Sequence, residues 1–179
     1  MNAELQEKVT IKVELLSSIN SLDLADLCNI TEQAINAGGG FGWIKVPPRN
    51  RLNKYWRGVV LIQNRKLIVG RLNNAIAGTL QLFFHPSNNE AQQNICNIVS
   101  HFIAPWARGY GLAKAMIDKA EIVGVESGAN CAQLDVRETQ TAAIQLFKSK
   151  GYKYWGTNPN YAQVDGKNIK GLYYFKKLK

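Results

Sequence analysis

The chain has 179 residues, of which 46% are hydrophobic and 20% charged, and its net charge is +9 at pH 7. This length fits a single domain, residues 1–179, and the composition excludes a disordered chain. No apolar run approaches the roughly 20 residues of a membrane span. The first 15 residues contain no apolar signal segment, and three scattered cysteines exclude a disulfide framework, so we expect a cytoplasmic protein. No His or Cys pair has metal-ligand spacing, so we expect no metal.

The excess positive charge is concentrated in one segment. Between Glu32 and Glu90 there is no Asp or Glu, whereas the same stretch contains eight Lys and Arg residues. Such a segment either solubilises the protein or attracts an anion, such as a cofactor phosphate, an acidic small molecule or nucleic acid. Both interpretations stay open.

The first third of the chain predicts one strand and two helices. Residues 8–15 alternate apolar and polar side chains, as a half-buried strand does. Residues 21–37 have helical spacing, which stops at three consecutive glycines. After the break at Pro47 and Pro48, residues 52–63 predict a second helix.

A β-rich stretch follows. Residues 67–72 and 75–84 predict a hairpin, because the two asparagines between them favour a tight turn. Residues 95–104 predict a further strand, which Pro105 ends.

Helices and strands alternate in the last third. Apolar side chains at steps of three and four predict a helix over residues 109–125, and residues 139–150 predict another. We expect strands over residues 131–136, 152–155 and 171–178. Several consecutive strands with one strand–helix–strand crossover predict an α+β fold with a mixed sheet.

The stretch FIAPWARGYGLAK, residues 102–114, carries the most chemical information. The turn at Gly109 and Gly111 leads directly into a helix, whose first N–H groups have no intrahelical partner. The glycines would let a phosphate approach those N–H groups, and Lys114 adds positive charge. The pattern predicts a pyrophosphate-binding turn that is neither a Walker loop nor a dinucleotide fingerprint. A tight turn without a ligand is the alternative.

From Arg108 to Ala113 the sequence resembles the Arg/Gln-x-x-Gly-x-Gly/Ala signature of the GNAT N-acetyltransferases. The resemblance continues through Leu134 and Asp135 to residues 143–152, and it is closest to the tabtoxin-resistance acetyltransferases. It extends over about residues 37–179. It implies the GNAT fold, a twisted, mixed but mostly antiparallel sheet of about seven strands flanked by about four helices.

This resemblance implies that acetyl-CoA is the cofactor. The pyrophosphate would lie on the glycine turn and the pantetheine arm along the fourth strand, where main-chain N–H groups could hold the oxyanion. The cofactor-binding residues that it implies are Phe102, Ile103, Ala104, Arg108, Gly109, Tyr110, Gly111, Leu112, Ala113, Lys114, Thr139, Gln140 and Phe147.

Two positions depart from the pattern of the family. Its usual basic carboxylate aligns with Asn97, which cannot accept a proton, and its usual acidic tyrosine aligns with Phe147, which has no hydroxyl. His101 would share a strand face with Asn97 by alternation and can titrate near neutrality, so we expect it to be the base. Asp135 is the second candidate. The alternatives are a packed strand histidine and a carboxylate that holds a loop. A β-bulge, which is common in this strand of GNAT proteins, would remove the common face of His101 and Asn97.

The acceptor is less defined than the cofactor. Phe41, Trp43, Trp155 and Tyr161 lie on segments that flank the acceptor cleft in such enzymes, although each could also serve packing. His85, before Pro86, is expected on the surface.

Three functions remain open. The first is acetylation of a primary amine on a small, amino-acid-like molecule. The second is acetylation of an acidic macromolecule such as aminoacyl-tRNA, docked on the basic segment and therefore sensitive to salt. The third is acyl-CoA binding without catalysis, because Asn97 and Phe147 replace the usual acid–base pair. GNAT proteins often dimerise, so the resemblance is also compatible with a homodimer.

Overall fold

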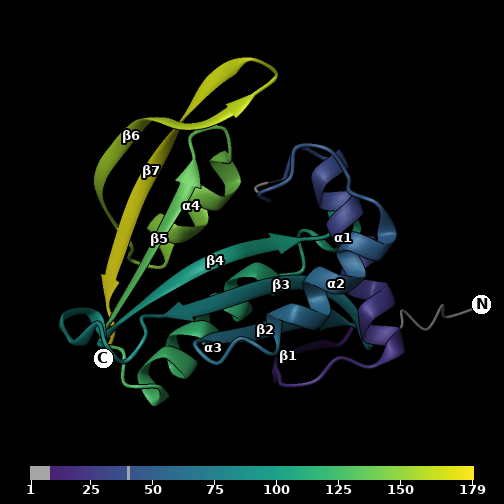
Figure 1. The fold of residues 1–179 in the computed structure, drawn as a ribbon, viewed down its shortest axis with the longest axis horizontal. Helices are drawn as coiled ribbons and strands as arrows, with labels where there is room; N and C mark the ends of the chain where they lie inside the picture. The colour runs from purple at the N-terminus through teal and green to yellow at the C-terminus, as the bar shows by residue number, and fades with distance from the viewer. Residues whose placement is uncertain (1–8, 40) are drawn as a thin grey trace, which may run out of the picture.

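A computed structural model describes residues 9–39 and 41–179, and in these residues seven strands form one twisted sheet. The strands are β1 (Ile11–Leu16), β2 (Arg65–Leu72), β3 (Ala75–Phe84), β4 (Ile95–Ile103), β5 (Cys131–Arg137), β6 (Lys153–Val164) and β7 (Lys167–Lys177). Their order across the sheet is β1-β2-β3-β4-β5-β7-β6 (Figure 1). Among the strands of the described residues, only β4 and β5 pair in parallel.

Four α-helices flank this sheet in the described residues. They are α1 (Ser21–Asn36), α2 (Arg49–Val59), α3 (Leu112–Glu126) and α4 (Thr141–Ser149), and two short 3₁₀ turns, η1 (Glu90–Gln92) and η2 (Pro105–Ala107), flank β4. Helices α1 and α2 cover one face of β2–β4, and α3 covers the opposite face (Figure 1). The predicted α+β fold with a mixed, mostly antiparallel sheet is confirmed.

Helix α3 packs directly on the sheet because two strands carry glycine beneath it. A Cβ atom at Gly70 would lie 2.7 Å from Met116 Sδ, and one at Gly78 would lie 3.2 Å from the same atom. On the other face, Trp56 of α2 is fully buried and its indole N–H donates to Thr31 Oγ1 of α1 at 3.1 Å. Core side chains therefore lie on both faces of β2–β4, and they hold β4 in place.

The hairpin prediction is confirmed, while two helices begin elsewhere than expected. Asn73 and Asn74 both have positive φ, 47° and 72°, as a two-residue turn of this kind requires. Helix α2 begins at Arg49, directly after Pro48, and α3 begins only at Leu112. The later start of α3 arises because left-handed glycines hold the preceding turn outside the helix.

The last two strands are much longer than predicted. Strands β6 and β7 form a hairpin that projects beyond the rest of the sheet and turns at Asp165 and Gly166, where φ is 48° and 75° (Figure 1). Most side chains of β6 are exposed, and its register shifts between Asn158 and Ala162. The alternation that reveals a strand is therefore missing from this part of the sequence. At the other end of the chain, the predicted strand is β1, and Lys8 lies outside the described residues.

Candidate functional site

The sheet opens between β4 and β5. The two strands pair only from Ile95–Cys131 to Ile98–Leu134, although β4 continues to Ile103 and β5 to Arg137. Beyond the last pair they diverge (Figure 1) and border a cleft of about 840 Å³. Such a gap exposes main-chain groups of both strands to whatever enters it.

A bulge in β4 decides which side chains border this cleft. Val99 pairs with Gln81 and Phe102 with Thr79, so Ser100 and His101 together oppose a single residue of β3. Ser100 has a φ of 52°, and its carbonyl accepts a hydrogen bond from Thr79 Oγ1 at 3.0 Å. The bulge reverses the alternation of side chains after Val99.

The expected common face of His101 and Asn97 is therefore wrong. The His101 ring packs edge-on against Phe147 of α4, with centroids 5.8 Å apart. Asn97 faces the opposite side of the sheet, where its Nδ2 lies 3.3 Å from His85 Nε2. His85, expected on the surface, is instead half-buried against Phe83. The next residue, Phe102, packs against Phe41 at 5.5 Å.

His101 is held neutral by its surroundings. Its Nε2 atom is inaccessible to solvent and has no hydrogen-bond partner among the described residues. Burial lowers the pKa of His101 from 6.5 to about 4, because the charged ring would lose its hydration. At pH 7 the cleft is thus bordered by an uncharged imidazole.

The predicted pyrophosphate turn lies open at one end of the cleft. Gly109 and Gly111 have φ of 88° and 78°, and a Cβ atom at either position would meet no atom within 4 Å. No side chain caps α3, and the main-chain N–H groups of residues 109–114 form no hydrogen bond to the described residues. Arg108 and Lys114 are exposed beside the turn. Its geometry fits an anion.

Helix α4 and the segment before it form the far wall. This wall includes Thr139, Gln140, Ala143, Leu146 and Phe147. Phe147 is buried and also packs against Tyr152, with centroids 5.4 Å apart. Phe147 therefore belongs to the core while one side of its ring borders the cleft.

Two hydrogen bonds cross the cleft at the end away from the β4–β5 pairing. Arg137 Nη2 donates to the Phe41 carbonyl at 2.7 Å, and Gln140 Nε2 donates to the Gly38 carbonyl at 2.9 Å. They join β5 and the start of α4 to the loop that follows α1. Nothing in the local sequence around Arg137 indicates these partners.

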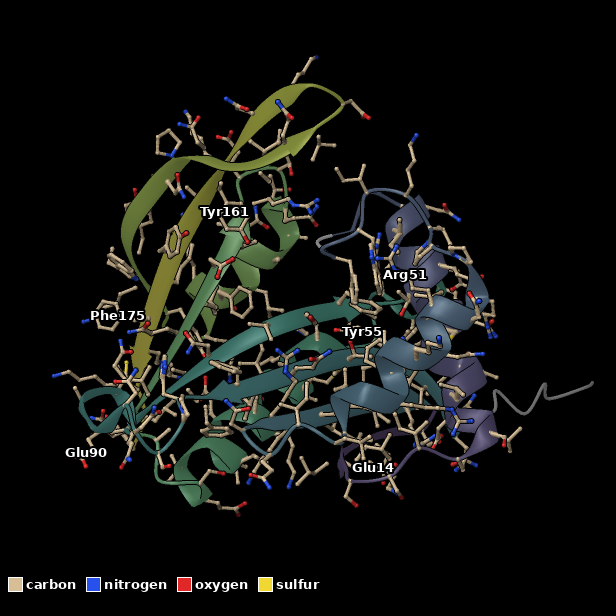
Figure 2. The ribbon with its side chains drawn as sticks, in the orientation of Figure 1. Glu14, Arg51, Tyr55, Glu90, Tyr161 and Phe175 are labelled. Carbon is tan, nitrogen blue, oxygen red and sulfur yellow. The ribbon has the colours of Figure 1, made fainter. Side chains whose placement is uncertain are left out.

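Asp135 and Tyr161 form a pair on the wall of the cleft. The Tyr161 hydroxyl donates to the exposed Asp135 carboxylate, and both residues line the cleft. Burial and the neighbouring carboxylate raise the pKa of Tyr161, so it stays protonated. Tyr161 lies on the side of the cleft that β5–β7 form (Figure 2).

The other aromatic residues expected around the acceptor are dispersed. Phe41 lines the cleft but is buried, stacked on Trp43 at 5.1 Å. Trp43 borders a second cavity of about 330 Å³ that shares Arg137 with the first. Trp155 is exposed beside Tyr173 and does not line either cavity. Only Tyr161 combines a place in the cleft with a polar partner there.

The basic segment does not form one continuous surface. Arg49 and Arg71 make ion pairs with carboxylates, and Arg65 and Lys66 donate to Gln81 and Ser127. Besides Arg49, the exposed members are Lys45, Arg51, Lys54 and Arg57, of which the last three lie on α2. Arg51 projects from α2 (Figure 2). Half of the charge that could attract a polyanion is therefore engaged within the protein.

Comparison with known proteins identifies the family. Residues 34–152 match the family model of the Acetyltransferase (GNAT) family. The chain belongs to this family. A relative in Azospirillum brasilense, the uncharacterized N-acetyltransferase in the hisH-hisA intergenic region, is 43% identical over 130 residues, 73% of this chain and 77% of the relative.

Solved structures share the fold of this GNAT acetyltransferase. The N-acetyltransferase from Staphylococcus aureus Mu50 is 17% identical with a TM-score of 0.80, covering 95% of this chain and 99% of that one. YncA from Salmonella typhimurium, solved with its cofactor acetyl-CoA, is 14% identical with a TM-score of 0.77, covering 94% of both chains. GNAT acetyltransferases use acetyl-CoA, so the predicted family, fold and cofactor are confirmed.

Within residues 9–39 and 41–179, none of the helices of this GNAT acetyltransferase has the length and apolar character that a membrane crossing requires.

Proposed function

We propose that this protein is a single-domain, cytoplasmic N-acetyltransferase that moves the acetyl group of acetyl-CoA to a primary amine of a small molecule. The observation that carries the proposal is the cleft between β4 and β5, which is bordered at one end by the open turn before α3. The name of the Azospirillum brasilense relative supports nitrogen as the acceptor atom. The ion pairs of Arg49 and Arg71 and the internal hydrogen bonds of Arg65 and Lys66 favour a small acceptor over a nucleic acid.

The glycine turn and β4 would hold the donor. Residues 109–114 offer main-chain N–H groups to a pyrophosphate, and Arg108 and Lys114 supply positive charge beside it. When bound, acetyl-CoA supplies an activated thioester. The Ala104 N–H already donates to the Ala77 carbonyl at 2.8 Å, so by strand alternation the Ile103 N–H points into the cleft.

Asp135 would accept the proton of the amine. As the C–N bond forms and the C–S bond breaks, the nitrogen becomes positive and its proton strongly acidic, so a carboxylate is a sufficient base. Tyr161 fixes the Asp135 side chain through its hydroxyl. The leaving thiolate takes a proton from solvent, since thiols have a pKa of about 8.5.

His101 and Asn97 would act on opposite sides of β4. His101 borders the side formed by α4, where its neutral ring packs against Phe147 and forms part of the cleft wall beside the donor. Asn97 would orient His85, or a water molecule, on the other side. We expect the acceptor to be amino-acid-like, as in the tabtoxin-resistance acetyltransferases that the sequence resembles.

An assay of free thiol tests the proposal. Purified protein is mixed with acetyl-CoA and a panel of amino acids, polyamines and simple alkylamines, and CoA release is followed with a thiol reagent. We expect turnover with at least one amine and a thermal shift with acetyl-CoA alone. A thermal shift without turnover across the panel would favour non-catalytic binding, and turnover that requires RNA would favour a macromolecular acceptor.

A further inference from the structure

Few charged side chains border the cleft, and they are of unequal sign. Among the described residues that line it, the only carboxylate is Asp135 and the only arginines are Arg108 and Arg137, with no lysine. Arg108 belongs to the glycine turn before α3. Arg137 is therefore the cation that shares a wall with the proposed base.

Arg137 and Asp135 project from the same face of β5. They are two residues apart, and the pairing of β5 with β7 runs without a shift from Cys131–Lys177 to Arg137–Gly171, so alternation holds. The Tyr161 ring lies over Gly171, directly opposite Arg137, and its hydroxyl reaches Asp135. The three side chains thus form one cluster.

The guanidinium of Arg137 is not neutralised by the protein. Its Nη2 donates to a neutral acceptor, the Phe41 carbonyl, and no carboxylate of residues 9–39 or 41–179 forms an ion pair with it. By contrast, Arg71, which is also partly buried, is bound by both Glu14 and Asp23. A half-buried guanidinium keeps several N–H donors that favour an anionic partner.

We propose that Arg137 binds a carboxylate on the acceptor whose amine lies at Asp135. The inference rests on the proposed acetyltransferase function and specifies its substrate class. Successive same-face positions on a strand are roughly 6–7 Å apart. A carboxylate and an ammonium group at the two ends of this interval, each within hydrogen-bond reach, belong to an α-amino acid or a close analogue.

The second cavity offers room for the remainder of such an acceptor. It shares Gly38, Gly39, Arg137 and Thr139 with the cleft and continues towards Trp43 and Ile169. Arg137 therefore stands where the two cavities meet. An amino acid held by its charged end at Arg137 and Asp135 could direct its side chain past Thr139.

The experiment compares each L-amino acid with its own α-carboxamide in the thiol-release assay. We expect the wild type to prefer the acid form of its best acceptor. Arg137→Gln should lower kcat/KM for that acid by roughly 10- to 100-fold, as expected for a lost hydrogen bond to a charged group, and leave the amide unaffected. Arg137→Lys should restore part of the preference. Arg57→Gln, on the exposed side of α2, is the control of equal charge.

The outcomes separate this inference from the proposed function. Equal loss for acid and amide would assign Arg137 a structural role, and a raised KM for acetyl-CoA alone would assign it to the donor; either result overturns the inference. Turnover of uncharged alkylamines in preference to amino acids would overturn it while the acetyltransferase function stands. Absence of turnover with every amine would overturn both. Thermal unfolding of each variant verifies that the fold is retained.

Discussion

Tyr161 lies so close to Gly171 that a Cβ atom at position 171 would come within 2.3 Å of Cγ and Cδ2 of the tyrosine ring. The glycine is buried on β7, and its lack of a side chain lets the ring contact the strand directly. In that position the tyrosine hydroxyl reaches Asp135. A residue without functional groups thus determines the geometry of the proposed base.

Gly171→Ala should therefore displace Tyr161 and weaken catalysis. We expect the free energy of unfolding to fall by about 1–3 kcal/mol, as for other overpacked sites. We also expect kcat to fall, because Asp135 loses its hydrogen-bond donor. Urea unfolding and the thiol-release assay measure the two effects. Gly156→Ala on β6, where a Cβ atom meets nothing within 4 Å, is the matched control. A normal kcat in a destabilised Gly171→Ala protein would contradict the role of Tyr161.

Gly111→Ala should reduce cofactor affinity more than stability. The added methyl group meets no protein atom within 4 Å, so the stability cost is the strain of a left-handed residue, about 1–2 kcal/mol. The methyl group would occupy the space beside the N–H groups of the turn. Calorimetric titration with acetyl-CoA should show Kd raised by roughly tenfold or more, as for the loss of one or more charge-assisted hydrogen bonds.

Gly128→Ala is the control for that substitution. Gly128 follows the other end of α3, has a φ of 90° and is equally open, so it carries the same strain without any place in the turn. Equal cofactor affinities of the Gly111→Ala and Gly128→Ala proteins would remove the turn from the binding site.

His101 should make the protein sensitive to acid. The unfolded chain binds a proton at this histidine near pH 6.5, whereas the folded protein does so only near pH 4. Between these values the unfolded state holds more protons, so stability falls as the pH falls from about 6.5 to 4. The loss attributable to His101 is about 3 kcal/mol at most. Urea unfolding at pH 7 and pH 4.5 should show a smaller difference for His101→Leu than for the wild type.

The control is His85→Gln, which removes the other histidine and is measured by the same urea unfolding at pH 7 and pH 4.5. If His101→Leu and the wild type lose equal stability between pH 7 and pH 4.5, the buried imidazole is not the cause of the acid sensitivity.

Asp135→Asn should slow acetyl transfer with little effect on stability. Its carboxylate is exposed, so the fold does not depend on it, while loss of a general base costs roughly 100-fold or more in kcat. The rate deficit should shrink as the pH rises, because hydroxide can then accept the proton of the attacking amine in place of Asp135. The control is Glu90→Gln, which removes an exposed carboxylate from η1, far from Asp135 in the sequence. Wild-type kcat in Asp135→Asn would exclude Asp135 as the base.

The sequence predicted the parts of the fold that local chemistry determines. Asn73 and Asn74 indicated the hairpin because few residues tolerate two successive positive φ angles. Gly109 and Gly111 indicated the open turn for the same reason, and the family resemblance then supplied the cofactor. These signals reside in neighbouring residues, and so one sequence suffices to interpret them.

The features that sequence reasoning missed depend on distant partners. The bulge at Ser100 is stabilised by Thr79 of another strand, and nothing around residue 100 indicates it. Arg137 meets Phe41, 96 residues earlier, and carries no motif. His85 and Asn97 come together only because β3 and β4 pair. The face of His101 was wrongly predicted because the alternation was continued to residue 101, although the family resemblance left a bulge in this strand open.

The hydrogen bonds from Arg137 and Gln140 to main-chain carbonyls hold the two walls of the cleft together at one end. The four residue pairs that join β4 to β5 lie at the opposite end and serve as a hinge. If the cleft widens at this end, the hydrogen bonds of Arg137 and Gln140 must break, while the four residue pairs between β4 and β5 remain formed. The bond from the charged Arg137 contributes about 1.5–3 kcal/mol net and the bond from the neutral Gln140 about 1 kcal/mol, so ligands could exchange by a small swing of one half-sheet, with no strand unpaired.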